Sequence, residues 1–449
     1  MAKRYCIVGL GNRGLASYAV PLVQEYSDVA ELVALCDISP TRLAYAKEQL
    51  GIDVPLFTDF DEMLAKVPSD VVIVTTTDAT HHEYIVKALE AGRDAITEKP
   101  MTTHIEGVRA ILEAERRTGR KVTVTFNVRH GRLAMELRRL VQSGVIGRVH
   151  SVEKQYTLNT LHGADYYRRW HRQKAHSGGL LVHKATHHFD LVNWIIDAEP
   201  QVIYAQGHRY FYGPTRSERG VRCKTCDYKA TCEFYFDVEA SERNRRMYVE
   251  AEADSGYIRD ACVFSPDIDI EDTMHVAVRY TKGILFNYSL VTYAPFEGYR
   301  LVIHGEKGRL ETVSGQQYAA QEQRSLAARS RAMTEPSPWL RSAFDQAEGV
   351  ELETVIRIYP TYGGEIVHPV PRVVESGGHG GSDKHLRNLL FRGIERDPSL
   401  GQAADSWAGA MSVLIGIGAN ESMRTGLPVR VADLLGESLV PERWAAEAS

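Results

Sequence analysis

Two histidines and a glycine-rich turn are the residues of this sequence whose types and spacing most readily support chemistry. His183 and His187 follow the glycine pair Gly178-Gly179 and are four residues apart, so one helix would place both on the same face. Imidazoles arranged in this way can transfer a proton, bind a metal ion or pack as ordinary polar side chains. At this point the sequence leaves all three roles open.

The glycine-rich turn lies near the start of the chain. Residues 9–14 fit the pattern G-x-G-x-x-G directly after the apolar run Tyr5–Val8, which suits a backbone that approaches a pyrophosphate at a helix N-terminus. Asp37 follows the next apolar run, where a carboxylate can bind a ribose 2′-hydroxyl and repel a 2′-phosphate. We therefore predict NAD in preference to NADP. The alternative is a plain glycine turn with a helix-capping aspartate.

The first 125 residues contain the elements that would position this turn. Short apolar, β-branched runs alternate with longer stretches of helical spacing, which indicates crossover connections and a parallel sheet covered on both faces. We predict an α/β Rossmann domain, a doubly wound parallel sheet, over residues 1–125. The expected strands are Tyr5–Val8, Leu32–Leu35, Val71–Val74, Ala95–Thr97 and Val122–Phe126, and the expected helices are Arg13–Tyr26, Thr41–Leu50, His81–Ala91 and Thr103–Thr118.

The pattern changes near residue 148, where strands joined mainly by turns indicate a large antiparallel sheet. We predict an α+β domain over residues 126–449, with a helix at Leu181–Ile196, a surface insertion at 316–347 and C-terminal helices within 382–449. The expected strands are Val149–Leu158, Gln201–Tyr212, Met274–Tyr280, Ile284–Val291, Tyr299–His304 and Val355–Pro360, and the C-terminal helices are Ser382–Glu395 and Ala403–Thr425, the latter capped by Gly426.

Three further motifs complete a family resemblance. Thr97-Glu98-Lys99-Pro100 ends the predicted fifth strand, Thr76–His81 forms a loop after the third, and Phe126–Arg129 lies at the domain junction. Together with the glycine turn, these segments resemble the Gfo/Idh/MocA family of sugar and polyol oxidoreductases, over nearly the whole chain. The resemblance implies an open-faced sheet in the second domain and, by analogy, a homo-oligomer, either a dimer or a tetramer.

The resemblance also implies catalytic roles. Lys99 is expected beside the nicotinamide and the substrate hydroxyl, where its charge lowers the pKa of the hydroxyl and relays its proton. His187 matches the histidine of the family and is predicted to be the general base. The usual aspartate four residues earlier is replaced by His183, which we expect to orient His187 or to contact substrate. Because of this departure, a metal-assisted site remains an alternative.

Other site residues follow from the same resemblance. The expected cofactor contacts are Gly9, Gly11, Asn12, Arg13, Gly14, Asp37, Thr75, Thr76, His81, Glu98, Lys99 and Asn127. The expected substrate contacts are Arg129, Lys184, Trp170, His379 and Asp383. His379 lies between two glycine pairs, which suits a loop that closes over a polar ligand or simply moves freely.

The cysteines are divided along the chain. Cys6 and Cys36 belong to predicted Rossmann strands, whereas Cys223, Cys226 and Cys232 form a C-x2-C-x5-C pattern. With Cys262 as the fourth ligand, this spacing predicts a structural zinc ion within an insertion at residues 212–262. An iron–sulfur cluster or free thiols are the alternatives.

Composition excludes several other functions. The 449 residues carry 53 basic and 58 acidic side chains, a net charge of -5, which argues against binding to nucleic acid or to a membrane surface. No stretch approaches the roughly 18–20 apolar residues of a membrane helix, and the N-terminal apolar run is too short for a signal peptide. We predict a cytoplasmic enzyme with a carbohydrate or polyol substrate.

The favoured function is an NAD-dependent sugar or polyol dehydrogenase that transfers hydride between a hydroxyl carbon and nicotinamide. The alternative is an NAD-retaining glycoside hydrolase that oxidises C3 transiently and eliminates the aglycone. A third class is a non-catalytic NAD-binding regulator, in which Lys99 and His187 would have no role in turnover.

Overall fold

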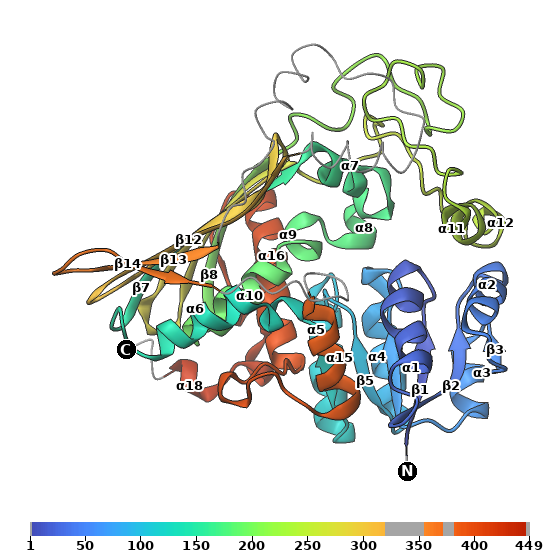
Figure 1. Cartoon of the computed structure of the whole chain (residues 1–449), viewed down its shortest axis with the longest axis horizontal. Coiled ribbons are helices and arrows are strands. Elements are labelled where there is room, and N and C mark those ends of the chain that lie inside the picture. The colour runs from blue at the N-terminus through green and yellow to red at the C-terminus, as the bar shows by residue number, and fades with distance from the viewer. Residues whose placement is uncertain (1, 319–353, 371–380, 446–449) are drawn as a thin grey trace.

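The computed structural model describes residues 2–318, 354–370 and 381–445. Figure 1 shows two sheets, one toward each end of the molecule, with helices packed between them. The predicted substrate residue His379 and most of the predicted insertion at 316–347 lie outside the described residues.

The first sheet confirms the predicted Rossmann architecture. Within the described residues, six parallel strands follow the order β3-β2-β1-β4-β5-β6, so the chain reverses direction of winding between β1 and β4. Each predicted strand is present within two residues of its expected bounds; the short elements β3 and α3 were not predicted. The strands are β1 Lys3–Val8, β2 Ala30–Cys36, β3 Leu56–Phe57, β4 Val71–Val74, β5 Asp94–Thr97 and β6 Val122–Val124.

Helices cover both faces of this sheet (Figure 1). The first begins as a π-helix, η1 Gly14–Ala19, and continues as α1 Val20–Gln24; the others are α2 Pro40–Leu50, α3 Phe60–Lys66, α4 His81–Glu90 and α5 Ile105–Thr118. The β-strands between them are buried on both sides, which explains their nearly continuous apolar sequence.

The second sheet is large and mostly antiparallel, as predicted. Its order is β14-β13-β12-β11-β7-β10-β9-β8-β15 in the part of the chain that the structure describes, and β7 and β10 form a parallel pair. The strands are β7 Val149–Asn159, β8 Pro200–His208, β9 Thr273–Tyr280, β10 Leu285–Ala294, β11 Phe296–Gly305, β12 Gly308–Tyr318, β13 Val355–Pro360, β14 Ile366–Pro369 and β15 Val429–Arg430. Burial alternates along β9 and β10, so one face is covered and the other is open.

The covered face of this sheet packs against helices. α16 contacts both β8 and α10, and a side-chain carbon at Gly416 of α16 would overlap the backbone of Leu181. The predicted helix Leu181–Ile196 is instead two helices that are interrupted at Lys184–Ala185. The helices of this domain are α6 Arg132–Gln142, α7 Thr160–Arg168, α8 Lys174–Ser177, α9 Leu180–His183, α10 Thr186–Ile196, α11 Glu242–Asn244, α12 Glu252–Ser255, α15 Ser382–Arg392, α16 Ser406–Thr425, α17 Val431–Leu435 and α18 Glu442–Ala445.

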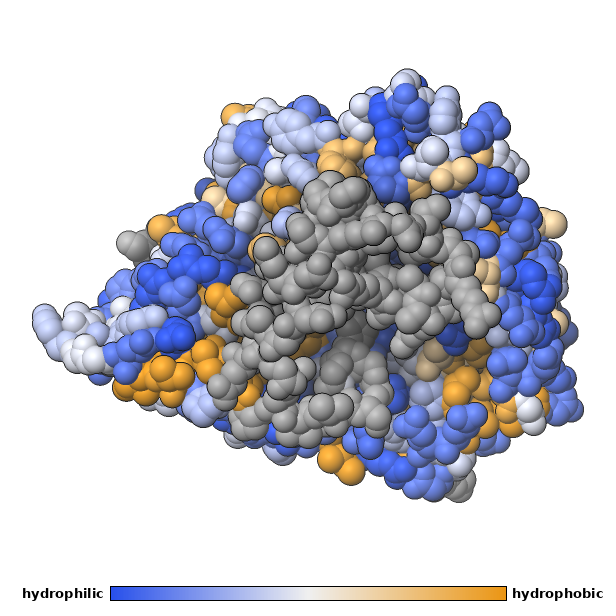
Figure 2. Space-filling view, turned by 45° about the horizontal axis from the view of Figure 1, so that its top comes forward, coloured by the Kyte–Doolittle hydropathy of each residue, from blue (hydrophilic) through white to orange (hydrophobic). Residues whose placement is uncertain are grey.

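Where Figure 2 shows described residues, their surface is mainly hydrophilic, with separate apolar areas. Among the described helices, none has the length and apolar composition that crossing a membrane requires.

A buried ion pair joins the domain junction to the second domain. The guanidinium of Arg129 donates to both carboxylate oxygens of Asp190 on α10, at 2.8 and 2.5 Å, and to the carbonyl oxygen of Ala403 at 3.0 Å. Arg129 and Asp190 are 5% and 1% exposed. These contacts give Arg129 a structural role, and its predicted substrate contact stays a prediction.

We expect Arg129→Met to lower the free energy of unfolding by about 3–5 kcal/mol, because it leaves the Asp190 carboxylate buried without its cation. Chemical denaturation of the full chain measures the change. Arg392→Met is the matched control, since Arg392 pairs with Asp28 at the surface and its loss should have little effect. Equal stability of the two variants would contradict the structural role of Arg129.

Candidate active site

The glycine turn after β1 has the backbone geometry of a dinucleotide-binding loop. Gly9 has φ = 90°, and a side chain at Gly14 would overlap the carbonyl oxygen of Gly9. Thr75, at the end of β4, donates its hydroxyl to that same carbonyl at 2.5 Å. A β-carbon at Gly11 would meet no atom within 4 Å, so the backbone of the loop is open to a ligand at this position. These residues fit the pyrophosphate of NAD.

Asp37 follows β2 and is tied to the same loop. Its carboxylate accepts hydrogen bonds from the backbone N–H of Leu10 at 2.6 Å and from that of Ser39 at 2.8 Å. The guanidinium of Arg42 lies 3.3 Å from the carboxylate. Asp37 therefore fixes the loop as well as occupying the position from which a carboxylate can contact a ribose.

Glu98 connects the Thr97–Pro100 motif to the first helix. Its carboxylate accepts from Arg13 at 2.6 Å and from the hydroxyl of Tyr18 at 2.5 Å. Burial raises the pKa of Glu98, but Arg13 and Tyr18 outweigh burial, and the pKa is lowered overall. Glu98 is therefore a buried carboxylate that is kept ionised by its partners.

The other side of Arg13 faces Asp383, at the start of α15. Asp383 accepts two hydrogen bonds from the guanidinium of Arg13, at 3.0 and 3.1 Å, and one from the amide of Asn127 at 2.7 Å. The structure thus places Asp383 with the predicted cofactor residues Arg13 and Asn127. It therefore supports the residues of the cofactor loop, and its predicted substrate contact stays a prediction.

Lys99, at the end of β5, lies against the helix that carries His183. Its ammonium donates to the backbone carbonyl of His183 at 3.1 Å. Burial lowers the pKa of Lys99 to about 8, against the opposing effect of the carboxylates of Asp78 and Glu98. An amine with this pKa can exchange a proton near neutral pH.

His183 pairs with Asp78, a residue that the sequence analysis did not identify. The Nδ1 atom of His183 and the Oδ2 atom of Asp78 are 2.5 Å apart, and both side chains are buried. Burial lowers the pKa of His183 and raises that of Asp78, so burial disfavours a pair that carries both the imidazolium and the carboxylate charge. Asp78 thus brings a carboxylate from the loop after β4 to the side of His183.

Aromatic rings surround His183. The ring of His171 lies 4.1 Å from that of His183, and Trp170 stacks on His171 at 3.7 Å. Tyr166 completes the enclosure at 5.6 Å. Trp170 is partly exposed, as a substrate-stacking ring requires, and it lies beside the predicted catalytic residues.

His187 lies on α10, beyond the interruption at Lys184–Ala185. It is partly exposed, and its ring packs edge-on against Phe126 at 6.1 Å. Among the described residues, no group of three or more His, Cys, Asp or Glu side chains is placed to hold a metal ion, so the metal alternative for His183 and His187 has no support. The two histidines belong to different helices, with His183 fixed by Asp78.

The loop after β4 is anchored to the Thr97–Pro100 motif. The two ring nitrogens of His81 lie 2.8 Å from the carbonyl oxygen of Pro100 and 3.1 Å from that of Thr76. The predicted cofactor residues Thr76 and His81 are thereby brought together with Lys99.

Comparisons with known proteins agree with this site. The model of the oxidoreductase family's NAD-binding Rossmann fold matches residues 3–126, and that of its C-terminal alpha/beta domain matches residues 138–431. The chain belongs to the Gfo/Idh/MocA oxidoreductase family. YteT of Bacillus subtilis (strain 168), described as an oxidoreductase, is 36% identical over 96% of this chain and 98% of its own.

Two other similar proteins match at lower identity. The myo-inositol 2-dehydrogenase of Thermotoga maritima is 27% identical over 45% of this oxidoreductase and 58% of its own chain. The scyllo-inositol dehydrogenase of Lactobacillus casei, solved with NAD(H) and scyllo-inositol, has a TM-score of 0.60 at 17% identity and covers 96% of this chain and 100% of its own. This last likeness shows the fold.

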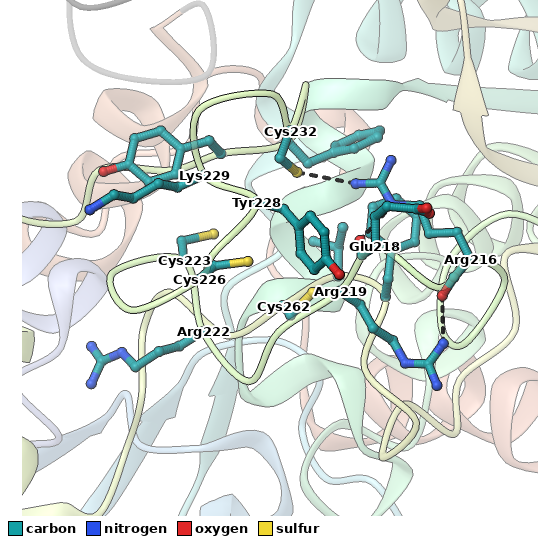
Figure 3. A pocket seen from close by; sticks show the side chains of 14 residues that line it. Arg216, Glu218, Arg219, Arg222, Cys223, Cys226, Tyr228, Lys229, Cys232 and Cys262 are labelled. Carbon is teal, nitrogen blue, oxygen red and sulfur yellow. Dashed lines mark hydrogen bonds between the residues drawn. The ribbon is translucent and has the colours of Figure 1, made fainter.

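The predicted zinc site in this oxidoreductase is not supported. The four thiols are free and line one pocket with Tyr228 and Phe234 (Figure 3), but no three of them are placed to bind one ion among the described residues. The thiol of Cys232 instead accepts from Arg216 at 3.1 Å. The four cysteines do lie at one pocket, but their spacing in the sequence does not determine the directions of their side chains. These residues are Cys223, Cys226, Cys232 and Cys262.

The segment between Cys232 and Cys262 contacts the dinucleotide loop. The hydroxyl of Tyr248 accepts from the backbone N–H of Asn12 at 3.2 Å. Asp254, on α12, accepts from the hydroxyl of Ser39 at 2.6 Å and from the backbone N–H of Thr41 at 3.1 Å. Figure 1 shows α11 and α12 beside α2. The insertion thus reaches the part of the Rossmann domain that would hold the ribose.

We expect Asp37→Ser to weaken NADH binding by about tenfold and to reduce the preference for NADH over NADPH. The variant loses charged hydrogen bonds to the loop and the charge that repels a 2′-phosphate, while Arg42 remains beside it. Calorimetric titration with both cofactors measures the change. Asp59→Ser, which removes an exposed cap of α3, is the control. An unchanged cofactor preference would show that Asp37 does not face the ribose.

Proposed function

We propose that the chain is an NAD-dependent dehydrogenase that oxidises a hydroxyl carbon of a sugar or polyol. The observation that carries the proposal is the placement of Lys99, with a pKa of about 8, against the His183–Asp78 pair at the carboxyl ends of β4 and β5. The inositol dehydrogenases among its relatives support a polyol or sugar as the substrate class.

In this proposal, bound NAD supplies the hydride acceptor, and side chains of the chain manage the proton. His187 takes the hydroxyl proton as general base, and the neutral amine of Lys99 relays that proton. His183 is a positioning residue, because Asp78 fixes its ring and its carbonyl oxygen fixes Lys99. The partly exposed side chains of Lys184 and Trp170 provide the substrate contacts.

We also retain four proposals from the sequence. The domain boundary lies between residues 125 and 126, the chain acts as a homo-oligomer, it acts in the cytoplasm, and the predicted cofactor contacts include Gly9, Gly11, Gly14, Thr75 and Thr76. The open face of the second sheet supports the oligomer, because it offers a broad surface for a second copy.

Incubation of the full chain with NAD+ and a panel of polyols, sugars and glycosides tests the activity. We expect stoichiometric NADH with at least one polyol or sugar. Lys99→Met and His187→Gln should each reduce turnover by about 10²–10⁴-fold while NADH binding persists, because each removes a proton-transfer group. Release of an aglycone without net NADH would identify the glycosidase instead. If the chain binds NADH but turns over none of these compounds, the result would favour the non-catalytic NAD-binding regulator.

The pH profile provides a separate prediction. A neutral amine accepts a proton, so oxidation should rise as the pH passes through about 8, the pKa of Lys99. Asp78 raises that pKa, and Asp78→Asn should therefore move the midpoint to lower pH. The pH dependence of kcat/KM measures the shift, with Asp61→Asn as control because Asp61 pairs with Lys87 at the surface. An unchanged midpoint would show that Asp78 does not affect the pKa of Lys99.

A further inference from the structure

Two lysines lie on the covered side of the second sheet, next to the proposed catalytic residues. Lys154 lies in β7, where Val152, Lys154 and Leu158 are buried while Glu153 and Gln155 are exposed. Lys154 is only 1% exposed, although a lysine at an inward strand position must give up most of its hydration. Lys184, between α9 and α10, is partly exposed. Neither packing nor the proposed proton transfer accounts for Lys154.

The two ammonium groups lie over neighbouring aromatic rings. The Nζ atom of Lys154 is 4.3 Å from the ring centre of Tyr299, and that of Lys184 is 5.4 Å from the ring centre of Tyr156. The rings of Tyr156 and Tyr299 are stacked, with centres 6.2 Å apart and planes at 14°. The stacked rings therefore hold two cations close to each other.

The two ammonium groups repel each other, and nearby carboxylates do not balance their charge fully. Burial, together with the charge of Lys184, lowers the pKa of Lys154 to about 7; within the described residues, Lys184 is the only charged group that acts on it. The nearby carboxylate is Glu297, which already accepts from Tyr156 at 3.1 Å and contacts His162 at 2.8 Å. With both lysines protonated, this group of three carries one excess positive charge, which one anionic group would balance.

The lysines adjoin the reaction site. Lys184 follows His183 directly and also lowers the pKa of Lys99. His188 links the two sides, because its ring lies 4.1 Å from that of Tyr156 and its Nδ1 atom lies 2.7 Å from the hydroxyl of Tyr288, the strand partner of Lys154. The charges of Lys154, Lys184 and Lys99 all act on the ring of His188, so the three ammonium groups lie around one residue.

We propose that the substrate is an acidic sugar, a uronate, whose carboxylate is bound by Lys154 and Lys184 while its reacting hydroxyl faces Lys99 and His187. This inference rests on the proposed dehydrogenase function. A carboxylate supplies the one negative charge that balances this group. A phosphate dianion would add one negative charge too many, and a neutral inositol would leave the excess positive charge unbalanced.

Substrate pairs that differ in charge test the inference. The full chain is assayed with NAD+ and glucuronate, glucuronamide, galacturonate, galactose and glucose 6-phosphate. We expect a uronate to exceed its neutral counterpart in kcat/KM by roughly 30-fold or more. Preference for glucuronamide or galactose, or for the phosphate, would overturn the proposal.

Lysine variants provide the second part of the test. Lys154→Met and Lys184→Met should each lower the ratio of kcat/KM for the uronate to that for the neutral sugar by roughly 30-fold or more, with the larger fall for the buried Lys154. Lys282→Met, in the exposed turn between β9 and β10, is the control. Equal losses for charged and neutral sugars would contradict a carboxylate site.

Calorimetric titration with glucuronate and galacturonate in the presence of NADH separates this inference from the proposed function. Lysine-dependent uronate binding without any NADH formation would reject the dehydrogenase and keep the acidic-sugar site. NADH formation from neutral polyols, with no uronate binding, would reject the acidic-sugar site and keep the dehydrogenase. Thermal denaturation of each variant shows that the chain remains folded.

Discussion

The carboxylate of Glu98 is the contact on which the arrangement of the site depends. It joins the end of β5 to the first helix through Arg13 and Tyr18, and Arg13 continues the network to Asp383 on α15. Lys99 is the next residue after Glu98, so a network that spans both domains sets the position of the amine. A buried carboxylate needs such partners, because without them burial would neutralise it and the network would lose its central charge.

The parts of the fold and site that the sequence could predict are those encoded by neighbours along the chain. The glycine turn at residues 9–14 and the position of Lys99 at a strand end follow from local pattern, because the carboxyl ends of parallel strands meet at one edge. The contact between Asp78 and His183 joins residues 105 positions apart, and no local signal marks it. The inward orientation of Lys154 likewise depends on strand register, which an isolated lysine in a strand does not reveal.

Two local patterns were misleading for physical reasons. The apolar spacing of residues 181–196 is helical throughout, yet the backbone changes course at Lys184–Ala185, where α16 packs against α9 through Gly416. The spacing of Cys223, Cys226 and Cys232 resembles a metal site, but the thiol of Cys232 is directed at Arg216. In both cases tertiary contacts decide a geometry that sequence periodicity leaves undetermined.

The contacts of Tyr248 and Asp254 with the dinucleotide loop have a consequence for the lifetime of a bound cofactor. Both residues come from an insertion in the second domain, and both hold backbone groups at the ribose side of the first. A dinucleotide that leaves by this side has to displace the insertion, so its residence time depends on how often these contacts break. The loop that would hold the cofactor is thereby fixed in part by a segment that lies outside the dinucleotide fold.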